Sequence, residues 1–248
     1  MNNPQAELQT IDIEYKGKRS NTAPISWGEL FGFIGTYIGF SIVSYLLALL
    51  FSLSYGITFH LSLEDLQGNP LFELLDGVTF LCTILVFKRV RQFVWRSVSF
   101  AALKKGKTYF LILLALVLCQ TLQYLIFQVW GIETPQADND SNILLPKALE
   151  LIFFIISTCI VAPITEELFF RGILYRFVTD KFHFTLGILV SAAVFGSLHF
   201  GYPLAAGLMG VIFALLYYLT KSLVPGIVVH ALWNSYVTVS AIIATYSF

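Results

Sequence analysis

The sequence predicts an all-α membrane protein, a polytopic bundle of transmembrane helices. Two observations lead to this fold class. Of the 248 residues, 57% are hydrophobic and only 12% are charged, a composition well outside that of soluble globular proteins. The charges are also separated by long uncharged windows, each able to hold at least one helix of about 20 apolar residues. These windows are 30–63, 108–132, 182–220 and 222–248.

The uncharged windows and two weaker apolar segments together predict about seven spans. The weaker segment 71–90 carries acidic residues near one end. The other, 148–178, is long and contains Pro163, so an eighth span arises if the helix breaks at that proline. The predicted spans are 30–55, 71–90, 109–130, 148–178, 184–200, 204–220 and 224–246.

The basic residues predict the orientation of these spans, because lysine and arginine collect in short cytoplasmic connections. Alternate connections are basic, and the two between them, 56–70 and 131–146, contain acidic residues and no lysine or arginine. This alternation places the N-terminus in the cytoplasm and the C-terminus outside. We expect residues 1–28 to form a polar cytoplasmic tail and residues 29–248 to form the transmembrane domain.

Ionisable side chains inside the spans are the candidates for chemistry, since such groups are costly in lipid and by default mark a functional site. Glu73 and Asp76 lie near the outer end of their span, where a structural role is expected. The three cysteines have no CxxC spacing and are read as apolar filler (Cys82, Cys119 and Cys159). The remaining polar candidates are Glu166, Glu167, Arg171, His199, His230 and the amide Asn234.

The stretch VAPITEELFFRGILYRF, residues 161–177, carries two adjacent carboxylates and an arginine. Glu167 and Arg171 are four residues apart and share a helix face, where an ion pair would neutralise both charges. Glu166 is turned by about 100° from its neighbour and projects elsewhere. The two readings of this motif are a general base at Glu166, whose charge is the less compensated, and a structural salt-bridge cluster.

Two further motifs repeat the four-residue spacing on later spans. Phe195 and His199 share one helix face, and His230 and Asn234 share another. A lone histidine on an apolar helix is usually a core residue, but two histidines and an amide on spans beside an unpaired glutamate are harder to explain that way. Depths estimated from the helical rise of about 1.5 Å per residue place Glu166, His199, His230 and Asn234 around one cavity below the cytoplasmic face.

These residues also carry a family resemblance. EELFFR matches an EExxxR motif, FGSLH an FxxxH motif and HALWN an HxxxN motif, in the order found in the CPBP family of type II CAAX prenyl endopeptidases and their prokaryotic Abi relatives. The preceding APITEE and the following RG resemble that family too. The resemblance covers residues 148–240, the expected catalytic core, and HExxH, the signature of ordinary zincins, is absent.

The resemblance implies an intramembrane endopeptidase that cleaves a membrane-associated peptide or protein. By analogy, Glu166 activates a water with the help of His199, and His230 and Asn234 stabilise the oxyanion. Glu167, Arg171 and Phe195 would support the site. A metallo-type variant uses Glu166, His199 and His230 as ligands of a divalent metal such as zinc. The sequence leaves both open and slightly favours the variant without a tightly bound zinc.

Two other function classes remain as alternatives. A non-catalytic bacteriocin self-immunity or scaffold protein of the same family would be expected to lose motif residues, and here all of them are present. A proton-coupled transporter would typically show internal repeats and paired broken helices, which are not visible in the sequence. The expected partners are the lipid bilayer and a membrane-associated substrate, with no nucleic acid, in a prokaryotic plasma membrane with the site reached from the cytoplasm.

Overall fold

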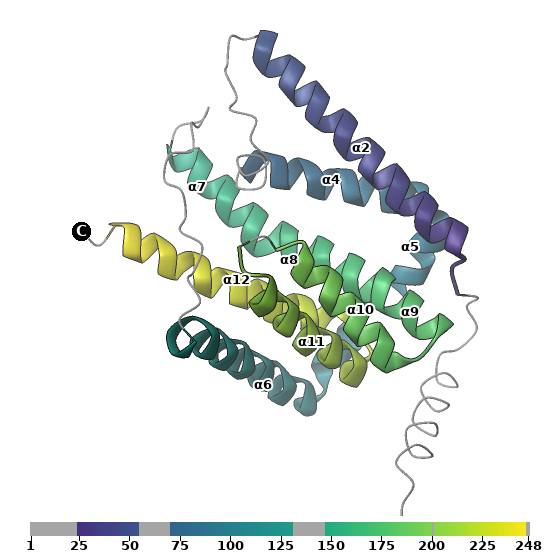
Figure 1. Ribbon diagram of the computed structural model, residues 1–248, viewed down its shortest axis with the longest axis vertical. Coiled ribbons are helices and arrows are strands. Elements are labelled where there is room, and N and C mark those ends of the chain that lie inside the picture. The colour runs from purple at the N-terminus through teal and green to yellow at the C-terminus, as the bar shows by residue number, and fades with distance from the viewer. Residues whose placement is uncertain (1–23, 55–69, 131–146, 200, 247–248) are drawn as a thin grey trace, which may run out of the picture.

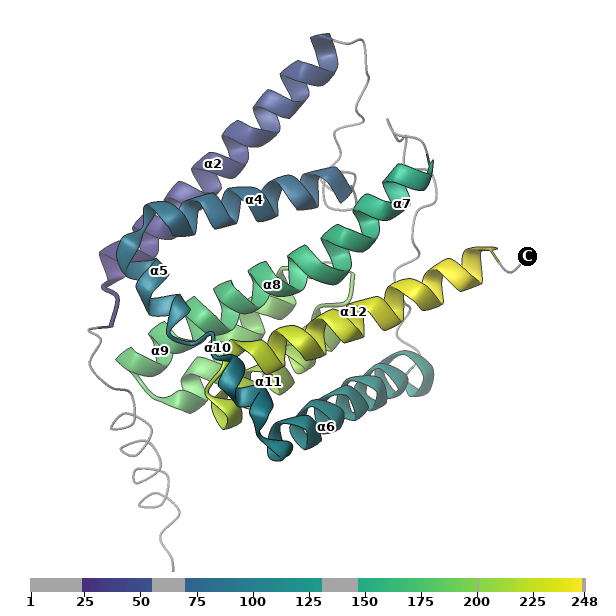
Figure 2. The same cartoon turned by 180° about the vertical axis from the view of Figure 1, so that it is seen from behind.

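The computed structural model describes residues 24–54, 70–130, 147–199 and 201–246. Every regular element in these ranges is a helix, and Figures 1 and 2 show the helices as one bundle with α2 at its edge. The predicted all-α membrane bundle is confirmed. Most of the predicted cytoplasmic tail and both acidic connections lie outside the described residues.

The centre of the bundle is one continuous helical segment, which we call the long helix. It runs without a break from Lys147 to Lys181 and contains most of the candidate motif. Its parts are α7 (Lys147–Ile156), η3 (Ser157–Val161), α8 (Ala162–Glu166), η4 (Glu167–Tyr175) and α9 (Arg176–Lys181), of which η3 and η4 are π-helical. The alternative of an eighth span created by a break at Pro163 is therefore wrong.

The long helix passes through Pro163 because the turn before it is widened. A proline inside a regular α-helix removes one backbone donor and its ring clashes with the carbonyl four residues earlier. The π-helical η3 changes this register, and the Ala162 N–H donates to the Ser157 carbonyl five residues back. Hydroxyl groups also bond to carbonyls of the same helix, Ser157 to Phe154 and Thr165 to Val161. Such bonds compete with the backbone ladder and loosen it locally.

Three helices close around the second half of the long helix (Figures 1 and 2). They are α10 (Phe184–Ser197), α11 (Pro203–Thr220) and α12 (Leu223–Tyr246). The tight pairing of α10 with α11 depends on Gly196, where a Cβ atom would come within 2.5 Å of the Pro203 carbonyl oxygen. Close approach at small residues is how transmembrane helices pack in lipid, where burial of apolar surface supplies little drive.

α12 occupies the position that matters most for the site. It packs against η3, α8 and η4 of the long helix, and on its other side against α6 (Gly106–Gln123). α6 continues into one π-helical turn, η2 (Tyr124–Val129). The cluster between α6, α11 and α12 is apolar and includes Ile112, Phe213 and Trp233. The first half of α12 is thereby held in place beside the long helix.

The N-terminal helices form a second layer against the long helix. α2 (Trp27–Ser54) packs along α4 (Pro70–Val86), and α4 packs on η3. Asp76 of α4 accepts hydrogen bonds from Tyr37 and from Ser41 of α2, the latter at 2.9 Å. Because this carboxylate is engaged by two hydroxyls of a neighbouring helix, the structure gives Asp76 the role of joining two helices.

Two of the predicted spans take a different form in the structure. Within the described ranges, five helices are long and apolar enough to cross a membrane, or up to six if a bent pair counts as one span. The predicted span 71–90 is instead a pair bent by 105°, in which α4 is followed by α5 (Lys88–Trp95) and η1 (Phe100–Lys104). The predicted span 184–200 is the shorter α10, which ends at Ser197. The count of seven and the orientation stay predictions.

Candidate active site

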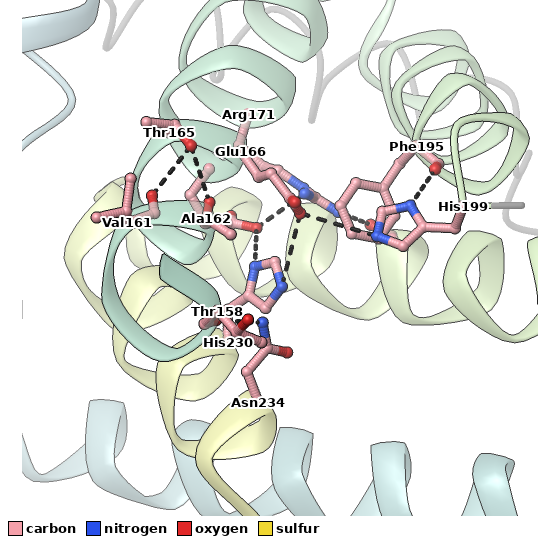
Figure 3. Close-up of polar contacts among 12 residues, drawn as sticks. Thr158, Val161, Ala162, Thr165, Glu166, Arg171, Phe195, His199, His230 and Asn234 are labelled. Atoms are coloured by element: carbon pink, nitrogen blue, oxygen red, sulfur yellow. Dashed lines mark hydrogen bonds and ion pairs between the residues drawn. The ribbon is translucent and has the colours of Figure 1, made fainter. Parts of the chain in front are cut away.

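The two adjacent carboxylates of the long helix have different surroundings. Glu167 is fully buried and its Oε1 lies 2.8 Å from Nη1 of Arg171, which is also fully buried. The side chain of Glu166, at the end of α8, keeps 27% exposure and turns toward α10 and α12. Figure 3 shows the Glu166 carboxylate between the rings of His199 and His230. The ion pair and the separate direction of Glu166 both follow the spacing in the sequence.

Arg171 contacts residues of three elements through its guanidinium group. Its Nη2 donates to the Gly210 carbonyl of α11 at 3.1 Å. Its guanidinium carbon also lies 4.5 Å from the ring centre of Phe195 and 5.2 Å from that of Phe213. A guanidinium over an aromatic face is stabilised by the ring quadrupole, more strongly where water is excluded. Arg171 therefore joins the long helix to α10 and α11 beneath the site.

His230 of α12 contacts both carboxylates. Its Nδ1 lies 3.4 Å from Glu167 Oε1, and its Nε2 lies 3.7 Å from Glu166 Oε2. The ring is buried and packs 4.8 Å from the ring of Phe213, centre to centre. Through this imidazole the buried ion pair and the more open Glu166 become one polar cluster. The spacing of the sequence motifs does not reveal this bridging position.

His199 faces Glu166 from the opposite side, just after the end of α10. Its Nδ1 lies 2.7 Å from the Phe195 carbonyl oxygen. A carbonyl oxygen can only accept, so Nδ1 carries a proton, and in the neutral ring Nε2 presents its lone pair. This Nε2 lies 4.0 Å from Glu166 Oε2. The motif FGSLH thus fixes the tautomer of the histidine through its own first residue.

The Glu166 oxygen between the two imidazoles is a buried polar atom. Glu166 Oε2 has no hydrogen-bond partner among the described residues, although it lies between Nε2 of His199 and Nε2 of His230. A buried carboxylate oxygen normally has a partner, and separations of about 4 Å are those bridged by a small polar group. Among the described residues, this oxygen is therefore a buried acceptor that faces two imidazole nitrogens and still lacks a donor.

Asn234 lies one turn beyond His230 on α12 but is already engaged. Its Nδ2 donates to the Thr158 carbonyl of η3 at 2.9 Å. An amide group has two N–H donors, so one remains for another acceptor. The hydroxyl of Thr158 in turn donates to Glu73 of α4 at 3.3 Å. Thr158 and its partner Glu73 are additional polar residues of the site, and no motif in the sequence points to them.

Tyr202 is a further residue that the motifs do not indicate. It lies in the connection between α10 and α11, and its ring centre is 5.6 Å from that of His199. The side chain keeps 40% exposure, and its phenolic hydroxyl can both donate and accept a hydrogen bond. The sequence offers one indirect signal for this residue, because Gly201, Tyr202 and Pro203 fall between the predicted spans 184–200 and 204–220.

The alternative that Glu166, His199 and His230 bind a zinc ion can be tested against these distances. Glu166, His199 and His230 offer one oxygen and two nitrogens, ligand types that zinc accepts. Ligands about 2.1 Å from a tetrahedral zinc lie about 3.4 Å from one another, whereas the Glu166 oxygen lies 3.7 and 4.0 Å from the two nitrogens. No group of three or more such side chains within the described ranges is arranged to hold a metal ion. As arranged, the three side chains do not fit a zinc site.

Comparison with known proteins matches the part of the chain that carries this geometry. Residues 148–236 match the family model of the Rce1-like type II CAAX prenyl endopeptidases. The predicted resemblance to the CPBP family is confirmed. The matched segment contains all three motifs, from the beginning of the long helix to α12.

Two curated bacterial proteins are similar over longer stretches. The putative membrane peptidase YdiL of Bacillus subtilis (strain 168) is 26% identical over 182 residues, which are 70% of this chain and 72% of the relative. The membrane-embedded CAAX protease MroQ of Staphylococcus aureus (strain USA300) is 25% identical over 135 residues, or 51% of this chain and 53% of the relative. No solved structure matches the chain significantly.

Proposed function

We propose that this protein is an intramembrane endopeptidase that hydrolyses a peptide bond of a membrane-associated peptide or protein. One observation carries the proposal: Glu166 Oε2 is buried without a hydrogen-bond partner among the described residues and faces the Nε2 atoms of His199 and His230. A carboxylate beside two imidazoles supplies a base and proton carriers at one point. The match to a peptidase family model over the same residues supports this reading.

The proposed reaction begins with a water molecule held between Glu166 and His199. Glu166 accepts a proton from the water while the water oxygen bonds to the carbonyl carbon of the substrate, and the carbonyl electrons move to its oxygen. When the C–N bond breaks, those electrons restore the carbonyl group, and Glu166 returns the proton to the leaving nitrogen. His199 orients the water, because its Nδ1 is fixed by the Phe195 carbonyl.

His230 and Asn234 are the proposed donors to the oxyanion. In the imidazolium form of His230 both ring nitrogens donate, Nδ1 toward Glu167 Oε1 and Nε2 toward the side where substrate would meet Glu166. Asn234 uses one N–H for the Thr158 carbonyl and keeps the other. Preorganised donors of this kind stabilise the charge that develops in the transition state, and losing one typically costs a factor of about 10² to 10³ in kcat.

The substrate class is proposed from the relatives. One relative is named as a CAAX protease and the other as a putative membrane peptidase. We propose a CAAX-protease-like specificity for a C-terminal segment presented at the membrane, in a prokaryotic plasma membrane and from the cytoplasmic side. The first test compares the membrane-associated peptides of cells that produce the wild-type protein with those of cells that produce Glu166→Gln.

The expected result is a peptide product that is present with the wild type and missing with Glu166→Gln, at equal amounts of inserted protein. A quenched-fluorescence peptide spanning that cleavage site, the reporter peptide, then allows kcat and KM to be measured with purified protein. The same set of products in both cell populations would refute the proposal. Products that persist with Glu166→Gln but vanish with His199→Ala would assign the base elsewhere.

Metal dependence is tested directly. Because the ligand distances do not fit zinc, we expect purified enzyme to keep its activity on the reporter peptide after treatment with 1,10-phenanthroline and dialysis. The measurement pairs the cleavage rate with the metal content of the same sample. Loss of activity that returns on addition of zinc, together with about one zinc per chain, would establish the metallo-type mechanism instead.

A further inference from the structure

The side chain of Asn234 is oriented by the backbone carbonyl of Thr158. In the hydrogen-bond register of η3, the residue that would donate to this carbonyl is Pro163. In η3 the bonds run five residues back, and the Ala162 N–H donates to the Ser157 carbonyl. The next donor in that register, for the Thr158 carbonyl, would be the N–H of residue 163. Residue 163 is proline and has no N–H. The Thr158 carbonyl instead accepts from Asn234 Nδ2 at 2.9 Å.

We propose that Pro163 is a positioning residue: by lacking an N–H, it reserves the Thr158 carbonyl for Asn234 and so fixes the amide beside His230. This inference rests on the proposed peptidase function. A carbonyl oxygen can only accept, so it holds the NH2 side of the amide toward η3 and determines where the second N–H points. The proline and the asparagine are 71 residues apart in the chain, yet one backbone atom couples them.

The position of Thr158 is itself fixed from the other side. Its hydroxyl donates to Glu73 of α4 at 3.3 Å. Asn234, Thr158 and Glu73 therefore form a line of hydrogen bonds that crosses from α12 through η3 to α4. Figure 3 shows the Asn234 amide next to Thr158 and below the His230 ring. An acceptor fixed in this way can orient the amide more sharply than a mobile side chain could.

The test replaces Pro163 by two residues of the same size, alanine and lactic acid, of which only alanine has a backbone N–H. Pro163→Ala restores a backbone N–H that can bond the Thr158 carbonyl and displace Asn234. Lactic acid at the same position, introduced by nonsense suppression, carries alanine's methyl group but has an ester oxygen in place of the N–H. Pro225→Ala is the matched control, since a proline in the first turn of α12 replaces an N–H that would have no partner in its helix.

We expect Pro163→Ala to lower kcat on the reporter peptide by roughly ten- to a hundredfold, part of the loss of a full oxyanion donor, with KM nearly unchanged. The lactic acid variant and Pro225→Ala should keep kcat within about threefold of the wild type. The Tm of Pro163→Ala should be equal or higher, because alanine favours a helix interior. If Pro163 had a purely structural role, Pro163→Ala would instead lower the Tm, and kcat would fall only in proportion to the fraction of folded protein.

Three outcomes would overturn the inference. They are a wild-type kcat for Pro163→Ala, an equal loss of kcat for the alanine and lactic acid variants, and a loss of kcat explained by a lower Tm. Failure of the proposed function looks different, because Glu166→Gln would then retain cleavage of the reporter peptide. If Glu166→Gln is inactive and Pro163→Ala is fully active, only the positioning role is refuted.

Discussion

At the scale of single residues, the neighbouring carboxylates of Glu166 and Glu167 differ in role because their surroundings differ. Glu167 is fully buried against Arg171, and Glu166 keeps partial exposure and faces two imidazoles. The four-residue spacing of Glu167 and Arg171 made the ion pair predictable from the sequence. The contact of His230 with both carboxylates was not predictable, because it depends on how α12 is placed beside the long helix, which no local spacing encodes.

The buried pair has a stability consequence at this scale. Arg171→Ala leaves the Glu167 carboxylate buried without its cation, and removing one partner of a buried pair costs about 3–5 kcal/mol. We expect a correspondingly lower Tm for this variant in detergent. The control is Arg89→Ala, which removes an ion pair to Glu29 that is 60% exposed on the arginine side. Exposed pairs contribute about 0–1 kcal/mol, so equal Tm losses in the two variants would contradict the buried-pair reading.

At the scale of elements, the long helix has a feature that its sequence pattern does not predict, the way it continues through Pro163. Its apolar pattern and motif predicted the helix from 148 to 178, and Pro163 suggested a break. The structure keeps the helix continuous and absorbs the proline with a π-helical turn at η3. Register shifts of this kind depend on a few hydroxyl bonds and on the helices packed alongside. Helix periodicity alone therefore predicts the helix, but it does not predict that the Thr158 carbonyl is left for a side-chain donor.

The approach of α12 to η4 gives a prediction at this scale. A Cβ atom on Gly226 would lie 2.9 Å from Glu167 Oε2, and this carboxylate cannot move away without leaving Arg171. Gly226→Ala should therefore destabilise the protein by about 1–3 kcal/mol, as overpacking does, and lower kcat by displacing His230. Thermal unfolding and reporter cleavage measure the two effects.

Gly39→Ala on α2 is the matched control, because no atom lies within 4 Å of the added Cβ atom. That variant should be neutral or slightly more stable, since alanine is the better helix former. A Gly226→Ala protein with the Tm and kcat of the control would show that α12 has room to move at this point.

At the scale of the whole molecule, composition was enough to predict a helical membrane bundle, and three short motifs were enough to predict the resemblance to the type II CAAX prenyl endopeptidases. The helices α4 and α10 show where such prediction ends. Both come from apolar windows that count as spans by length, yet the chain bends by 105° after α4, and α10 ends at Ser197. Bends and early ends arise from packing between helices, which hydropathy does not record.

The three motifs meet only because the bundle folds as it does. Glu166, His199 and His230 come from the long helix, the end of α10 and α12, and one oxygen lies within 4.0 Å of both imidazoles. We therefore propose that a single carboxylate in the middle of this bundle, that of Glu166, performs the chemistry. Its neighbour Glu167 has the same functional group, but its carboxylate accepts a hydrogen bond from Arg171.

The most direct test is the cleavage rate of the reporter peptide by purified wild-type protein and by Glu166→Gln, which has almost the same shape but cannot accept a proton. We expect the variant to have the Tm of the wild type and a kcat lower by a factor of about 10³ or more, since general base and water activation are both lost. Cleavage by Glu166→Gln at the wild-type rate would contradict the proposed role of Glu166 as the base.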